Sequence, residues 1–66
     1  MQLHFNNESI HADVHSLLEF LEVYRLSDKN GIAVAVNDNV IPRSKWSEHT
    51  LQENDSILVI TAAAGG

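Results

Sequence analysis

The chain contains no cysteine and only one proline among its 66 residues. Without cysteine it can form no disulfide, thiolate metal site, iron–sulfur cluster or thiol nucleophile. Packing alone must hold the domain together, which suits a cytoplasmic protein. The longest apolar runs, at residues 32–36 and 57–60, are far shorter than a membrane span, and residues 1–10 do not resemble a signal peptide. We therefore expect no membrane association.

Basic residues are also few. Four Lys and Arg oppose nine Asp and Glu, which gives a formal net charge of -5. So few cations cannot follow a phosphate backbone, and we do not expect nucleic acid to be a partner. The acidic excess favours either attraction to a basic protein partner or simply the solubility of a small domain, and the sequence does not decide between these interpretations.

The chain is short for an enzyme. Residues 1–66 make one domain, of a size that buries only about 60% of its unfolded surface. Hydrophobic residues amount to 44%, which is enough for a single core but not for the walls of a deep substrate pocket. A binding or carrier role is therefore favoured over catalysis.

The first half of the chain predicts a hairpin and then a helix. Residues 2–6 alternate, Asn6-Asn7 is typical of a tight turn, and residues 8–12 return as a second strand. Asp13 is placed to cap a helix at residues 14–24. The apolar stripe of this helix has helical spacing and consists of Val14, Leu17, Leu18 and Leu21.

The second half predicts three more strands. Residues 32–37 form the clearest one, and Asp38-Asn39 suits a hairpin turn before a short return at residues 40–41. Pro42 ends that return because it has no N–H to donate, which places the strand at a sheet edge. A short helical turn is expected at residues 43–46 and the last strand at residues 56–61.

This order of elements predicts an α+β fold of the β-grasp (ubiquitin-like) type. One main helix crosses a mixed sheet of about five strands, and the last strand can pair in parallel with the first. Residues 62–66 follow as a flexible C-terminal tail.

Catalytic and ligand-binding motifs are not evident. The four histidines are more typical of a surface than of a metal site, since a third ligand for any pair is not apparent: His4, His11, His15 and His49. No Ser-His-Asp pattern, paired carboxylates or glycine-rich phosphate loop can be recognised. The single tryptophan, Trp46, is either an exposed partner anchor or a packing residue at the sheet edge, and we favour packing.

The last strand is apolar on both faces. Ile57 and Val59 are expected under the helix, while Leu58 and Ile60 join alanines 33 and 35 on the open face of the sheet. A one-layer sheet with an apolar open face usually meets a partner, so Leu58 and Ile60 are candidate partner-binding residues.

The final five residues suggest a reactive end. Two glycines contribute nothing to packing and lose the most entropy on ordering. A slim arm can thread a narrow tunnel in another enzyme, where the carboxylate of Gly66 attacks the α-phosphorus of ATP. Because glycine is unbranched, the resulting acyl-adenylate is unhindered. Gly65 precedes it in the terminal Gly-Gly, and three alanines keep the arm slim behind it: Ala62, Ala63 and Ala64.

Taken together, the motifs resemble the ThiS-type sulfur carriers of thiamin (thiazole) biosynthesis, in the ThiS/MoaD ubiquitin-like family. The most specific matches are the V-N-x-x-V-I-P-R-x-x-W pattern of residues 36–46 and the terminal A-G-G. The resemblance also includes residues 1–6, 14–21 and 57–60 with Leu51 and Asp55, and so spans the whole chain. The Asp13-Val14 pair departs from the Thr-Val that is frequent in the family, which concerns a helix cap only.

The resemblance implies a protein co-substrate and not an enzyme. A ThiF-like adenylyltransferase, with ATP and Mg, would adenylate Gly66, while the carrier binds no cofactor itself. A sulfurtransferase or cysteine desulfurase would then supply sulfur to give a C-terminal thiocarboxylate. The thiazole synthase ThiG would accept that sulfur.

Three alternatives remain open from the sequence. A MoaD-type small subunit of molybdopterin synthase shares the fold and the Gly-Gly end but typically lacks the P-R-x-x-W stretch. A ubiquitin-like modifier would form isopeptide conjugates on lysines. A plain interaction module would function without Gly65 and Gly66.

Overall fold

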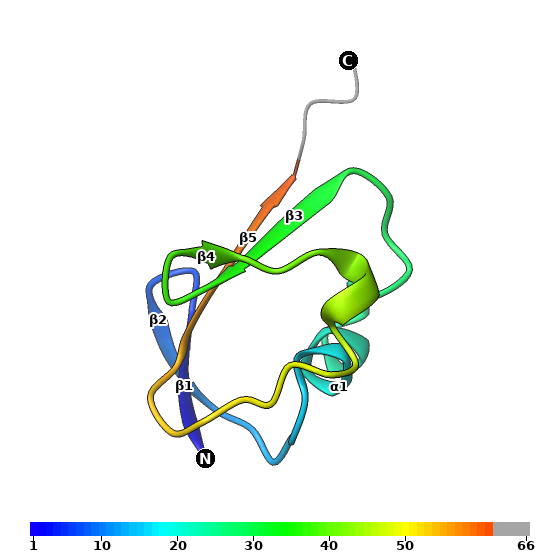
Figure 1. Cartoon of the computed structure of the whole chain (residues 1–66). Helices are drawn as coiled ribbons and strands as arrows, with labels where there is room; N and C mark the ends of the chain where they lie inside the picture. The colour runs from blue at the N-terminus through cyan, green and yellow to red at the C-terminus, as the bar shows by residue number, and fades with distance from the viewer. Residues whose placement is uncertain (62–66) are drawn as a thin grey trace.

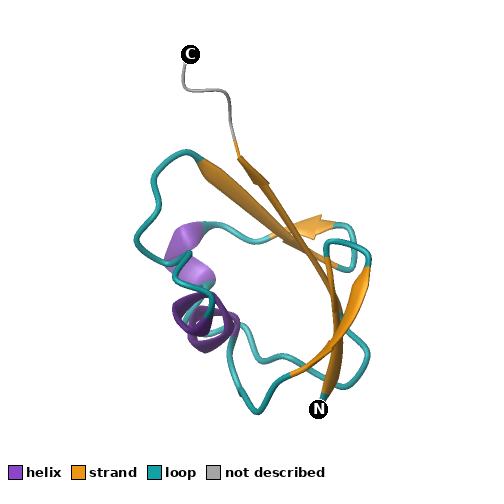
Figure 2. Ribbon diagram, turned by 180° about the vertical axis from the view of Figure 1, so that it is seen from behind, coloured by secondary structure: helices purple, strands orange, loops and turns teal. Residues whose placement is uncertain are grey.

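The computed structural model describes residues 1–61, and residues 62–66 lie outside this range. Within the described range, five strands, one α-helix and one 3-10 turn follow one another: β1 (Gln2–Phe5), β2 (Glu8–His11), α1 (Leu17–Val23), β3 (Ile32–Val36), β4 (Asn39–Val40), η1 (Arg43–Lys45) and β5 (Ser56–Thr61). The strands form a single sheet in the order β2-β1-β5-β3-β4, and α1 lies on one side of it (Figures 1 and 2).

The sheet is mixed, as predicted. The last strand, β5, pairs in parallel with β1 at the centre of the sheet and antiparallel with β3 on its other side. The short strand β4 is at the edge, where Pro42 prevents the pairing from continuing. These findings confirm the predicted parallel pairing of the first and last strands and the edge position of the strand before Pro42.

The two hairpins turn on residues that tolerate left-handed backbone. Asn6 and Asn7 have φ of 48° and 70°, and they connect β1 to β2 as predicted. The second turn is at Asn37 and Asp38, with φ of 51° and 71°. The prediction of Asp38-Asn39 was therefore wrong by one residue, because Asn39 pairs with the last residue of β3 and already belongs to β4.

Helix α1 begins later than predicted. Its N-cap is Ser16, whose side chain accepts from Glu19 N–H while the Glu19 carboxylate accepts from Ser16 N–H, which makes a capping box. Asp13 is not the cap. The residues before Leu17 are held extended by the segment that precedes β5: Leu17 N–H donates to the His49 carbonyl, and Leu51 N–H donates to the His15 carbonyl. This tertiary pairing overrides the local helical pattern.

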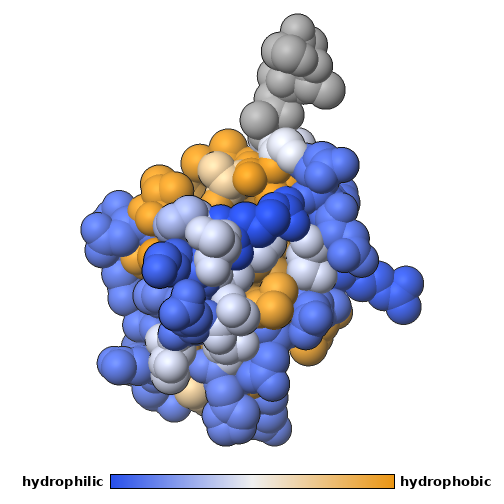
Figure 3. Space-filling view, turned by 45° about the vertical axis from the view of Figure 1, so that its right-hand side comes forward, coloured by the Kyte–Doolittle hydropathy of each residue, from blue (hydrophilic) through white to orange (hydrophobic). Residues whose placement is uncertain are grey.

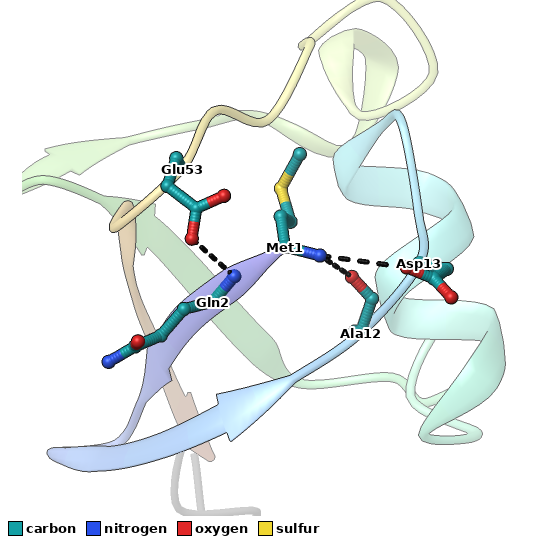
Figure 4. A network of polar contacts seen from close by, with 5 residues as sticks. All are labelled: Met1, Gln2, Ala12, Asp13 and Glu53. Carbon is teal, nitrogen blue, oxygen red and sulfur yellow. Dashed lines mark hydrogen bonds and ion pairs between the residues drawn. The ribbon is translucent and has the colours of Figure 1, made fainter.

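Asp13 instead faces the N-terminus of the chain. The Met1 ammonium donates to the Ala12 carbonyl at 2.9 Å and lies 3.6 Å from the Asp13 carboxylate (Figure 4). Beside it, Gln2 N–H donates to the Glu53 carboxylate at 2.7 Å. The start of β1 is thus tied both to the end of β2 and to the loop before β5.

The core lies between α1 and the sheet. Trp46 is 3% exposed and donates from Nε1 to the Ile41 carbonyl at 2.9 Å, so the packing interpretation is confirmed and the exposed anchor is not observed. The buried side chains come from β1, α1, β3 and β5 and from the segments that precede α1 and β5: Leu3, Val14, Leu17, Phe20, Leu21, Val34, Val36, Trp46, Leu51 and Ile57. Neither helical segment of residues 1–61 has the length and apolarity needed to cross a bilayer.

Candidate functional site

The face of the sheet opposite α1 is apolar over β3, β4 and β5. Register places Leu58 opposite Ala35 and Ile60 opposite Ala33, so the four residues share one face as predicted, and Val40 also lies opposite Ala35. Because directly opposite residues of paired strands share a face, these side chains form one surface. We call this surface the apolar patch and define it as Ala33, Ala35, Val40, Leu58 and Ile60.

The apolar patch is accessible to a partner. Val40 is 71% exposed, Ile60 54% and Leu58 41%, whereas Ile57, the preceding neighbour of Leu58 in β5, is 2% exposed. Val59 packs against the core from the same side as Ile57. The predicted division of β5 into a helix-facing and an open side is therefore confirmed. Exposed apolar side chains gathered in this way are typical of interaction surfaces.

The remainder of the open face is polar. Gln2 lies opposite His11 and His4 lies opposite Ser9, and these four alternate with the core residues of the β1–β2 hairpin. His4 Nδ1 is 3.5 Å from Ser9 Oγ. Within residues 1–61, no three His, Asp or Glu side chains are grouped as a metal site would require. The open face thus has a polar half over β2 and β1 and an apolar half over the other strands.

The apolar patch adjoins the end of the described chain. Thr61, the last residue of β5, lies opposite Ile32, the first residue of β3. Apolar side chains are gathered at this end of the molecule, beside the point where the grey atoms begin (Figure 3). A partner bound on the apolar patch is therefore adjacent to the place from which the chain continues toward Gly66.

The predicted reactive and tail residues lie outside the described residues: Ala62, Ala63, Ala64, Gly65 and Gly66. Their roles stay predictions, as does the partner-binding role of Leu58 and Ile60. What the structure adds is the position of these two side chains on an exposed face next to Thr61.

Side-chain amides from both hairpin turns fix β5, which sequence reasoning did not anticipate. Asn6 Oδ1 accepts from Val59 N–H at 2.9 Å, and Asn37 Oδ1 accepts from Ser56 N–H at 3.0 Å. Asn37 also donates to the Asp55 carboxylate at 2.9 Å. Asparagine at a turn is a visible signal in sequence, but its long-range partners are not. These bonds hold the strand that leads to the tail on both sides.

The fold defines a class of protein. One helix on a five-stranded mixed sheet, with the first and last strands parallel at its centre, is the β-grasp, ubiquitin-like architecture. A crystal structure of the thiamine biosynthesis protein ThiS from Geobacter metallireducens superimposes with a TM-score of 0.86 over all of both chains at 20% identity. An NMR structure of a thiamine biosynthesis protein from the same organism gives a TM-score of 0.78 over the whole chain and 88% of that protein, also at 20% identity.

Sequence comparison identifies the family within this class. The sequence model of the ThiS family matches residues 3–66, so the chain belongs to the ThiS family. A curated relative, the sulfur carrier protein ThiS of Escherichia coli (strain K12), is 36% identical over 70 residues that cover the whole of both chains. The resemblance inferred from the motifs is thereby confirmed.

Proposed function

We propose that this protein is a sulfur carrier of thiamin biosynthesis that acts in the cytoplasm. The observation that carries the proposal is the family match over residues 3–66, which includes the terminal Gly-Gly. The 36% identical Escherichia coli relative bears the name of a sulfur carrier protein and matches over its whole length. In this role the protein is a co-substrate of other enzymes and does not itself catalyse a reaction.

The proposed chemistry takes place on Gly66. Its carboxylate oxygen attacks the α-phosphorus of ATP in a ThiF-like adenylyltransferase that uses Mg, and pyrophosphate leaves. A sulfur nucleophile supplied by a sulfurtransferase or cysteine desulfurase then attacks the acyl carbonyl, and AMP leaves. A thiol then cleaves the bond between the donor and the transferred sulfur and ends in a disulfide with the donor, which leaves a thiocarboxylate that passes its sulfur to the thiazole synthase ThiG. All of these reagents belong to the partners, and the carrier supplies only the acyl group.

The apolar patch serves docking in this proposal. Leu58 and Ile60 project from the strand that ends at Thr61, so contact there brings the chain beyond Thr61 to the partner. Three alanines continue the partner-binding segment toward the glycines: Ala62, Ala63 and Ala64. A few well-packed residues near the centre of a contact usually contribute most of its binding energy.

Deletion of Gly66 tests the proposal. In cells that lack their own carrier, the full chain should restore thiazole formation and the truncated chain should not. The circular dichroism spectrum and thermal midpoint of the purified truncated chain should match those of the full chain, because Gly66 follows the last strand. Unimpaired thiazole formation by the truncated chain would show that the carrier role is wrong.

Two further measurements address the alternatives. Restoration of molybdopterin synthesis, in a strain that lacks only that small subunit, would favour the MoaD-type role. Lysine-linked conjugates on an immunoblot would favour the modifier. We expect neither.

A further inference from the structure

The guanidinium of Arg43 binds the backbone of the loop between α1 and β3. Nη1 donates to the Ser27 carbonyl at 2.7 Å, and Nη2 donates to the Lys29 carbonyl at 2.6 Å. Both bonds are short and have a charged donor, which makes them stronger than neutral hydrogen bonds. One side chain from η1 therefore holds two points of a loop that precedes it by more than a dozen residues.

Arg43 is itself supported by the core. Its guanidinium carbon lies 4.6 Å from the centre of the Trp46 ring, a distance at which a cation is attracted by the aromatic face. Trp46 is buried and is fixed by its bond to the Ile41 carbonyl, and its own carbonyl accepts from Leu18 N–H at 3.0 Å. The guanidinium thus connects a rigid part of the domain to an exposed loop.

Arg43 has no acidic partner among residues 1–61. The side-chain ion pair found in that range is between its neighbour Lys45 and Glu48, at 3.8 Å. The protein has a net charge of -5, yet this exposed arginine binds two loop carbonyls and no carboxylate among the described residues. Its contacts are therefore specific to the loop. A lysine could not replace it, because an ammonium on a flexible stem does not offer the paired, planar donors that reach two carbonyls.

The loop held by Arg43 leads into β3, whose first residue lies beside the end of β5. Gly31, the last residue before β3, has φ of 74° and turns the chain into Ile32, which lies opposite Thr61. In both ribbon views the loop rises from α1 and reaches the top of β3 beside the end of β5 (Figures 1 and 2). Residues 27–31 therefore end at Ile32, which pairs with Thr61, the last described residue before the predicted reactive glycine.

From this arrangement we propose that Arg43 is a positioning residue for the transfer reaction. Arg43 holds residues 27–31 in place, and this loop leads into Ile32, the partner of Thr61 in the sheet. In this way Arg43 helps to direct the residues after Thr61 toward the reaction centre of the partner. The role rests on the proposed carrier function. It is distinct from docking, because Arg43 lies in η1 and not in the strands that form the apolar patch.

The test compares three variants: Arg43→Ala, Arg43→Lys and Lys45→Ala. Lys45→Ala is the matched control. It also removes a cation from this turn, but the Lys45 ammonium pairs with Glu48 and not with a loop carbonyl. Amide hydrogen exchange reports whether residues 27–31 are loosened. Steady-state adenylation by a ThiF-like partner, with the carrier as the varied substrate, separates kcat from KM.

We expect faster exchange in the loop and a kcat lowered about tenfold for both Arg43 variants, since small misplacement of a reacting group is costly. KM for the carrier should change less than about twofold, because docking is retained. Arg43→Lys should not restore kcat, whereas a role in charge alone would allow it to do so. Lys45→Ala should behave as wild type in both measurements.

Three results would overturn the positioning role. One is an unchanged kcat in a variant whose loop is loosened, and another is unchanged loop exchange. The third is a raised KM with normal kcat, which would place Arg43 in the docking surface. If the wild-type chain is not adenylated at all, the proposed function fails first, and the exchange data still show whether Arg43 holds the loop.

Discussion

Asn37 donates from its side-chain amide to the Asp55 carboxylate over 2.9 Å, and this contact joins the β3–β4 turn to the segment that enters β5. The oxygen of the same amide accepts from Ser56 N–H, and Asp55 accepts in turn from Gln52 N–H at 2.9 Å. Two side chains therefore connect the β3–β4 turn to the start of β5 and to residue 52 in the loop before it. Both residues belong to the motif by which the sequence resembles the ThiS family, and the structure gives them a role in the fold.

Asn37→Ala should lower the free energy of unfolding by about 2 kcal/mol, because it removes two hydrogen bonds and puts alanine where φ is 51°. Urea denaturation followed by circular dichroism measures this. Asn39→Ala is the control: its single bond, to the Asn37 carbonyl, is long at 3.3 Å and exposed. Equal losses for the two variants would mean that the contact with Asp55 contributes little.

Arg25→Gly should stabilise the protein by about 1 kcal/mol. Arg25 follows the helix with φ of 60°, and the bonds from Arg25 N–H to Glu22 and from Leu26 N–H to Leu21 complete a Schellman motif that favours glycine. Arg25→Ala, which keeps the steric cost, should bring no gain. A stabilised Arg25→Ala variant would instead point to the arginine side chain as the source of the cost.

Stability should fall in acid partly through Glu19. The His15 and Ser16 N–H groups donate to its carboxylate at 2.7 and 3.1 Å and lower the pKa of Glu19 from the ordinary 4.5. Because the folded-state pKa is the lower one, this stabilisation is present above pH 4.5 and is lost as the pH falls through the folded-state pKa. Glu19→Gln keeps an acceptor but does not titrate.

The wild type should therefore lose more stability than Glu19→Gln between about pH 6 and about pH 3, as measured by thermal midpoints across that range. Parallel profiles for the two proteins would show that the capping carboxylate does not contribute to the acid sensitivity.

Leu58→Glu and Ile60→Glu should weaken binding to the adenylyltransferase at least about tenfold while changing stability by less than about 1 kcal/mol. The reason is that both side chains are exposed on the apolar patch. Val23→Glu is the matched control, since Val23 is 63% exposed but lies on α1. Calorimetric titration gives the affinities. If the two β5 variants bind like Val23→Glu, the partner docks elsewhere.

The sequence pattern correctly predicted those features of the fold that depend on neighbouring residues alone, such as the alternation of side chains along a strand. The alternation of β5 placed Leu58 and Ile60 on the open face because side chains of a strand alternate between its two faces. The helix start at Ser16 and the turn at Asn37 depend on bonds to the distant segment around residues 49–56, so sequence alone placed them wrongly. The contacts of Arg43 were hidden for the same reason, since two backbone carbonyls leave no trace in residue type.

In the proposed function, the acyl group of Gly66 carries sulfur. The most direct measurement is the intact mass of the protein as isolated from its own cells, and again after incubation with ATP, a ThiF-like adenylyltransferase and its sulfur donor. We expect a mass increase equal to one oxygen replaced by one sulfur, and fragmentation should locate it at Gly66. An unchanged mass with a competent partner and donor present would contradict the account and leave the protein an interaction module with an inert end.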